Sequence, residues 1–259
     1  MNIDALPWFH VTKPLKNPKL RLFCFSYAGG SAGVFYDWQS LLPEGVEVFS
    51  VQLPGRSDRI AERPLTKLGE IVDGLYKAIQ PYIKSCEYCF FGHSMGARVS
   101  YELASLLESN GFSAPRGLFV SGALAPNQAR KKPNIHHLPK PDFIRELGQI
   151  NGTPKELLEN TQLMEFILPV LKADFHVCET WPMSLPKKMN VPITALCGDS
   201  DDDISPDDMK HWSAFTGVSF KLFIFFGDHF FIHSRKTELV SALGGLMEKH
   251  LECKESCCF

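Results

Sequence analysis

The stretch Tyr88-Cys89-Phe90-Phe91-Gly92-His93-Ser94-Met95-Gly96 decides the fold of this 259-residue chain. An apolar run typical of a short buried strand leads directly into Gly-x-Ser-x-Gly, which is the sequence form of a nucleophile elbow. The glycines leave room for a tight turn, and the serine takes a strained backbone that projects its Oγ above the sheet. A helix should follow, because apolar residues recur there at helical spacing: Val99, Leu103, Leu106 and Leu107. The stretch indicates a serine hydrolase that works through an acyl-enzyme.

The composition is that of one large globular domain covering residues 1–259. Hydrophobic residues make up 44% of the chain and charged residues 22%, with a formal net charge of -2. This charge offers no basic field for nucleic acid. No apolar run approaches the ~20 residues of a membrane span, and the first residues lack the pattern of a secretory signal. Cysteines inside apolar runs (Cys24, Cys89 and Cys197) suit free thiols in a reducing cytoplasm, where we expect the protein to act.

Strand and helix patterns alternate along the chain. Such alternation implies a mostly parallel central sheet flanked by helices on both faces, and with the elbow it predicts an α/β-hydrolase fold. Helices are expected around Phe35–Leu42, Leu68–Ile79 and Leu239–Met247. The expected strands are Leu20–Ser26, Val46–Leu53, Tyr88–Phe91, Leu118–Val120, Ile193–Cys197 and Phe220–Phe226.

One segment, 127–190, breaks this alternation. It shows no strand pattern and holds helical fragments rich in Leu, Phe and Met, which prolines separate. So long an excursion inside a compact domain is usually a functional lid, and we expect the apolar residues between Phe143 and Leu171 to roof Ser94. The alternative is a helical insertion that is packed for stability alone.

A serine nucleophile needs a histidine base and an acid, and this fold supplies them later in the chain. His229 is the base candidate among nine histidines, because it directly follows the last strand. His93 lies in the elbow with its side chain expected to point away from the Ser94 Oγ. His233 could pair with His229 on a metal, but no third ligand is evident, so no metal is expected.

The acid should follow the preceding strand, in the loop Gly198-Asp199-Ser200-Asp201-Asp202-Asp203. Its carboxylate would accept from the histidine Nδ1–H and stabilise the imidazolium. Composition alone does not choose among the aspartates. The oxyanion hole needs two backbone N–H groups, one from Met95 after the nucleophile and one from the loop Phe25-Ser26-Tyr27-Ala28-Gly29-Gly30.

Several motifs together resemble the type II thioesterases, stand-alone α/β-hydrolases of non-ribosomal peptide and polyketide synthesis. The medium-chain thioesterase of animal fatty acid synthase is a close relative of that family. The resemblance covers about Leu20 to Leu251. Its motifs are Phe25-x-x-Ala28-Gly29-Gly30, Leu53-Pro54-Gly55-Arg56 with Arg59, Gly92-His93-Ser94-Met95-Gly96, Gly152-Thr153-Pro154, and Gly198-x-x-Asp201 with Trp212.

The resemblance implies a Ser94, Asp201 and His229 triad, with oxyanion donors at Ala28 and Met95. Asp201 is chosen because the family's acid lies three residues after the glycine and eleven before a tryptophan. Three positions depart from the family pattern without touching the triad: Ser26 for proline, Ser57 for an acidic residue and Lys172 for arginine.

The resemblance also implies a function. It is hydrolysis of acyl or aminoacyl thioesters from the phosphopantetheine arm of acyl or peptidyl carrier protein domains, which clears mis-loaded synthases. No cofactor is expected, since the substrate carries the phosphopantetheine, and neither nucleic acid nor membrane is an expected partner. We expect a monomer. The alternatives are medium-chain acyl release from a fatty acid synthase and a general carboxylesterase.

Overall fold

A computed structural model describes residues 8–150 and 158–251 of the chain. Within these ranges seven strands form one sheet in the order β1-β3-β2-β4-β5-β6-β7. Strands β2 to β7 are parallel, and β1 pairs antiparallel with β3. The expected α/β architecture is thus confirmed, whereas the Gly152-Thr153-Pro154 motif lies outside the described residues. The strands are β1 (Phe9–His10), β2 (Leu20–Phe25), β3 (Val46–Val51), β4 (Glu87–His93), β5 (Leu118–Ser121), β6 (Ile193–Gly198) and β7 (Phe220–Phe225).

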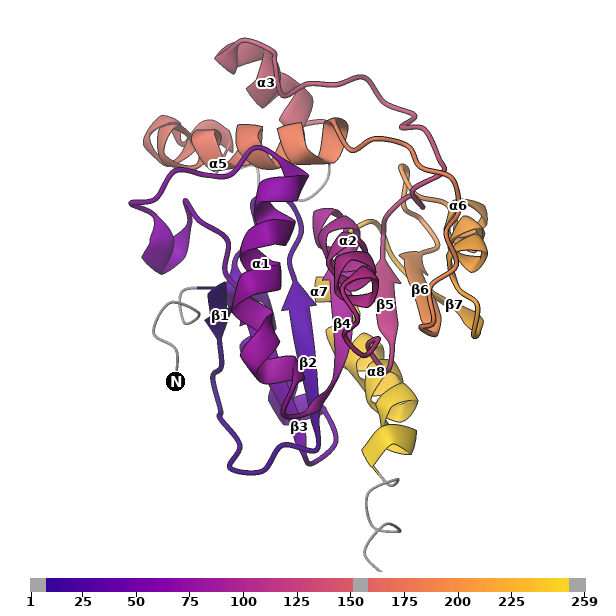
Figure 1. Cartoon of the computed structure of the whole chain (residues 1–259). Coiled ribbons are helices and arrows are strands. Elements are labelled where there is room, and N and C mark those ends of the chain that lie inside the picture. The colour runs from indigo at the N-terminus through magenta and orange to yellow at the C-terminus, as the bar shows by residue number, and fades with distance from the viewer. Residues whose placement is uncertain (1–7, 151–157, 252–259) are drawn as a thin grey trace, which may run out of the picture.

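Helices cover both faces of the sheet, as the alternation predicts. In Figure 1, α1 (Leu68–Ile83) and α2 (Met95–Ser109) lie in front of the strands and α8 (Lys236–Leu251) lies behind them. The short helices η4 (Ser57–Arg59), α6 (Pro206–Lys210), η5 (His211–Phe215) and α7 (Phe231–Ser234) lie in the connections. Among the described helices, none is long and apolar enough to cross a membrane.

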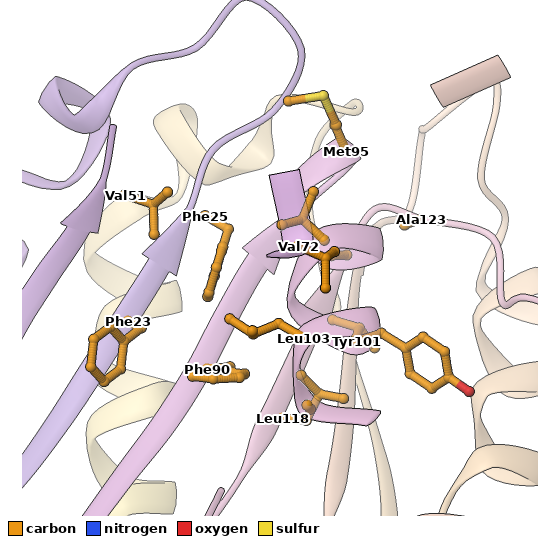
Figure 2. Packing of buried hydrophobic residues seen from close by; sticks show 14 of the residues in the cluster. Phe23, Phe25, Val51, Val72, Phe90, Met95, Tyr101, Leu103, Leu118 and Ala123 are labelled. Carbon is orange, nitrogen blue, oxygen red and sulfur yellow. The ribbon is translucent and has the colours of Figure 1, made fainter. Parts of the chain in front are cut away.

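The core forms because successive strand residues point to opposite faces of the sheet. Phe23 and Phe25 of β2 pack into the cluster under α1 and α2, whereas Leu22 and Cys24 pack into the cluster under α8. Figure 2 shows Phe23, Phe25 and Phe90 facing Leu103 of α2. This double-sided burial explains why the strands read as continuous apolar runs rather than alternating ones.

The structure differs from the sequence prediction mainly at element ends. The expected helix at Phe35–Leu42 is two 3₁₀ helices, η2 (Ala32–Phe35) and η3 (Trp38–Leu41). Phe35 and Trp38, three residues apart, are fully buried together, and a three-residue period favours the 3₁₀ form. Three predicted strands extend one or two residues too far, at Ser26, Leu53 and Phe226. The two-residue β1 was not predicted, because so short a strand has no readable period.

The 127–190 segment contains the cap, which we define as α3 (Lys140–Leu147) and α5 (Thr161–Glu179). Figure 1 shows both helices above the carboxyl ends of the strands. They share a small apolar cluster that includes Phe143, Met164 and Leu171. Pro169 lies inside α5, so the expectation that prolines separate the helical fragments is wrong there. Val170 and Leu171, which follow Pro169 directly, are buried, and tertiary packing of this kind can maintain a helix through a proline.

Candidate active site

Ser94 lies in a strained turn between β4 and α2. Its φ of 54° and ψ of -115° are values that non-glycine residues rarely adopt. A Cβ at Gly92 would lie 2.2 Å from the carbonyl oxygen of Gly96, and one at Gly96 would lie 2.1 Å from that of Phe25. Only glycine fits at either position, which confirms the steric reason given for the elbow motif. In the sheet Phe25 pairs with Gly92, so the loop after β2 lies beside the elbow.

His229 and Asp201 form a directed pair at the same edge of the sheet. The His229 Nδ1 lies 2.7 Å from the Asp201 Oδ2. Because a carboxylate only accepts, Nδ1 carries the proton and Nε2 keeps the lone pair that a general base needs. The Asp201 side chain is 1% exposed and that of His229 is 19% exposed, so the imidazole reaches solvent while the carboxylate stays behind it.

Asp201 is held in its ionised form. Burial alone raises the pKa of this carboxyl, but the hydrogen bond and charge of His229, with two backbone donors, outweigh burial and lower the pKa below its usual range. The backbone N–H groups of Asp203 and Ile204 donate to Oδ1 over 2.9 and 3.1 Å. The second carboxylate oxygen is therefore fixed by the loop itself.

The neighbouring aspartates have other partners. Asp199 accepts from the Gly227 backbone N–H over 3.0 Å and from the Ser200 hydroxyl. Asp203 pairs with Lys132, and Asp202 is exposed. Of the four aspartates in this loop, Asp201 is the one whose carboxylate contacts His229, in agreement with the choice that the family resemblance implied.

A cavity of about 450 Å³ joins the predicted site residues. Ser94, His229, Ala28 and Met95 all line it, and Asp201 stands behind His229. Met95 is the first residue of α2, so unpaired backbone N–H groups and the positive end of the helix dipole lie at the cavity wall. The arrangement places a hydroxyl, an oriented imidazole and backbone amides around one space.

The described part of the 127–190 segment supplies the other side of this cavity. Its lining side chains there include Leu147, Ile150, Leu171 and Phe175. These are apolar groups from the segment that the sequence predicted as a roof. The space between Ser94 and the cap can therefore hold an apolar chain of modest length.

The family model described as "Thioesterase domain" matches residues 20–246. The chain belongs to the thioesterase family. It is 41% identical over 233 residues to "Gramicidin S biosynthesis protein GrsT" of Aneurinibacillus migulanus, covering 90% of this chain and 91% of that protein. It is 34% identical over 239 residues to "Thioesterase PikA5" of Streptomyces venezuelae, covering 92% and 85%. The solved structure of the type II thioesterase BorB from the borrelidin biosynthetic cluster superposes with a TM-score of 0.83 at 32% identity, covering 95% and 98%.

In this thioesterase a buried ion pair ties the cap to the loop that carries Ala28. The Arg56 guanidinium donates to both oxygens of Asp174 on α5, over 2.6 and 2.8 Å, and the Gly29 backbone N–H donates to the same carboxylate over 2.7 Å. Asp174 has no exposed surface, so both its oxygens depend on these donors. Arg56 belongs to one of the motifs that resemble the family, but nothing in the sequence pairs it with a residue 118 positions away.

The other histidines that the sequence singled out take structural places in the thioesterase. His93 is fully buried beside His229, with ring centroids 5.0 Å apart, and its Nδ1 lies 2.9 Å from the Ser121 Oγ. Burial lowers the pKa of His93 well below its usual value and keeps the ring neutral. The His233 Nε2 contacts the Tyr27 hydroxyl over 2.8 Å. Among the described residues, no group of three or more His, Cys, Asp or Glu side chains is arranged so that it could hold a metal ion.

Proposed function

We propose that this thioesterase removes acyl and aminoacyl groups from the phosphopantetheine arms of carrier protein domains. In this role it would edit mis-loaded non-ribosomal peptide or polyketide synthases. The observation that carries the proposal is the cavity beneath the cap, where Ser94 and the Asp201-bonded His229 lie together in a chain of the thioesterase family. Support for the pathway comes from the relatives in gramicidin S and borrelidin biosynthesis.

The first half of the proposed reaction forms an acyl-enzyme. The Ser94 Oγ attacks the thioester carbonyl while the His229 Nε2 takes the hydroxyl proton. The backbone N–H groups of Ala28 and Met95 would stabilise the tetrahedral oxyanion, at ~3 kcal/mol per donor in comparable sites. The intermediate then collapses, and the pantetheine sulfur leaves with the proton that His229 returns.

The second half of the reaction releases the acid. A water molecule gives a proton to His229 and attacks the acyl carbonyl on Ser94, and collapse returns the proton to the serine oxygen. Asp201 keeps the imidazole in one tautomer and stabilises its charged form throughout. These steps use only the chain's own side chains, the substrate and water, so we propose no cofactor for them.

Carrier proteins are the partners that this reaction implies, because they hold the thioester. The cap leaves the cavity partly open to solvent at His229, where an extended pantetheine arm could enter. We propose that the enzyme acts in the cytoplasm, and the buried thiols of Cys24, Cys89 and Cys197 agree with a reducing compartment. Action as a monomer stays a prediction.

The proposal is tested by the rates at which the purified enzyme hydrolyses a panel of thioesters on one carrier protein. The panel contains acetyl, aminoacyl and decanoyl groups, with the matching oxygen esters of a small alcohol beside them. We expect faster hydrolysis of carrier thioesters than of oxygen esters, with acetyl and aminoacyl groups included among the good substrates. Preference for the decanoyl carrier alone would favour fatty acid release, and preference for the oxygen esters would favour a general carboxylesterase.

Enlarging a roof residue should shift the acyl preference toward short chains. Ile150 lines the cavity, so Ile150→Trp would fill space that a long acyl chain needs. Each methylene that loses its apolar environment forfeits ~0.8 kcal/mol, so we expect the decanoyl to butyryl ratio of kcat/KM to fall about tenfold.

The matched control for this roof variant is Leu163→Trp. Leu163 lies on α5 of the cap but is 48% exposed, so a larger side chain there points away from the cavity. We expect its chain-length profile to match that of the wild type. Identical profiles for wild type, Ile150→Trp and Leu163→Trp would mean that the cap is structural packing and not a roof.

A further inference from the structure

Arg98 places a cation in the wall of the cavity, close to the nucleophile in the fold. It lies four residues after Ser94, one turn along α2, and residues at this spacing share a helix face. Arg98 and Ser94 both line the cavity. Arg98 is half-buried, and burial lowers the pKa of its guanidinium, as expected for a charge partly shielded from water.

The contacts of Arg98 orient the guanidinium without neutralising it. Its Nη1 donates to the backbone carbonyl of Cys178 on α5, and its Cζ lies over the Trp181 ring, 4.8 Å from the ring centroid. Trp181 is itself held by a 3.0 Å hydrogen bond from its Nε1 to Glu102. A guanidinium has five N–H donors in a fixed planar fork, so most of its hydrogen-bonding capacity stays available to a ligand.

The other cations that line the cavity already have carboxylate partners. The Arg130 Nη2 lies 3.7 Å from the Glu179 Oε1, and the Lys131 Nζ lies 2.5 Å from the Asp208 Oδ2. Lys132 pairs with Asp203. For Arg98 there is no carboxylate within 4.0 Å among residues 8–150 and 158–251.

The positive end of α2 adds to the same field, because Arg98 is the fourth residue of that helix and lies at the end of its first turn. A half-buried cation without a carboxylate partner is less favourable than a paired one, and an anion that enters the cavity would supply that partner. The wall of the cavity near Ser94 is therefore complementary to a negative group on the substrate.

We propose that Arg98 is a specificity-determining residue that selects acyl groups carrying a carboxylate a few bonds beyond the thioester carbonyl. The substrate class is the monothioesters of dicarboxylic acids, including acidic aminoacyl groups. The planar fork of Arg98 would bind such a carboxylate through two parallel hydrogen bonds, which lysine cannot reproduce. This inference rests on the proposed thioesterase function and adds the chemistry of the acyl group to it.

The test compares two acyl groups of nearly equal size on one carrier protein. Succinyl ends in a carboxylate, and 4-methylpentanoyl replaces that carboxylate with an isopropyl group. We expect the wild type to hydrolyse succinyl with the larger kcat/KM. In Arg98→Met the ratio of succinyl to 4-methylpentanoyl should fall at least tenfold, and Arg98→Lys should lie between the two, since it keeps the charge and loses the fork.

Lys131→Met is the matched control, because it also removes one cation from the cavity wall but takes it from an exposed residue paired with Asp208. Its ratio should stay within about twofold of the wild type, as a screened exposed pair contributes little. An equal fall in Lys131→Met and Arg98→Met would overturn the assignment to Arg98.

Two further outcomes separate the inference from the function on which it rests. A wild type that hydrolyses both thioesters but prefers 4-methylpentanoyl overturns the role of Arg98 without any variant, and it leaves the thioesterase function standing. A wild type that hydrolyses neither thioester, nor the acetyl carrier, overturns both.

Discussion

Replacement of Ser94 with alanine is expected to lower kcat/KM for carrier thioesters by about three orders of magnitude or more, the usual effect of removing a nucleophile. Without Oγ no acyl-enzyme can form, and the residual rate would come from water attacking within the oxyanion hole. The fold should persist, because alanine is smaller and the turn depends on Gly92 and Gly96 rather than on the serine hydroxyl.

Two measurements accompany the Ser94→Ala kinetics. A serine-directed fluorophosphonate probe should label the wild type and leave the variant unlabelled, with the adduct mapped to Ser94 by mass spectrometry. The thermal midpoints of the two proteins should agree within a few degrees, which excludes unfolding as the cause. A variant that keeps a tenth of the wild-type rate would show that Ser94 is not the nucleophile.

Replacement of Asp201 with asparagine is expected to lower kcat/KM by about 10²- to 10⁴-fold, because an amide N–H at this position would favour the wrong tautomer of His229. The structure gives the reason in its 2.7 Å contact between the carboxylate and Nδ1. Nε2 of His229 would then carry the proton and could not act as the base. The protonated imidazole would also lose the negative charge of Asp201 that stabilises it.

The neighbouring aspartates are matched controls for the Asp201 variant. Asp199→Asn and Asp202→Asn remove one charge from the same loop without touching His229. Their rates should fall no more than about threefold, since they alter only the screened field around the site. If Asp203→Asn proved the damaging change instead, the choice of Asp201 would be wrong.

Local sequence patterns were sufficient to predict the fold and to propose most residues of the candidate site. The apolar run before Gly92 and the glycines around Ser94 predict the elbow because strand burial and a tight turn are properties of adjacent residues. His229 follows from its place after the last apolar strand. The weakest predictions concern element ends and β1, where too few residues exist to show a period.

Tertiary structure decided what depends on contacts between distant segments. Asp201 is distinguished from its acidic neighbours by where the loop turns toward His229, and the family resemblance rather than the composition supplied that choice. Arg56 and Asp174 form an ion pair although 118 residues separate them in the sequence. The folded chain places the Arg98 guanidinium against the Cys178 carbonyl and the Trp181 ring, with no carboxylate beside it among the described residues, and the proposed role of its charge depends on that placement. Periodicity records which face of an element is buried, whereas the partner of a buried charge is set by how two elements pack, and no local pattern encodes that.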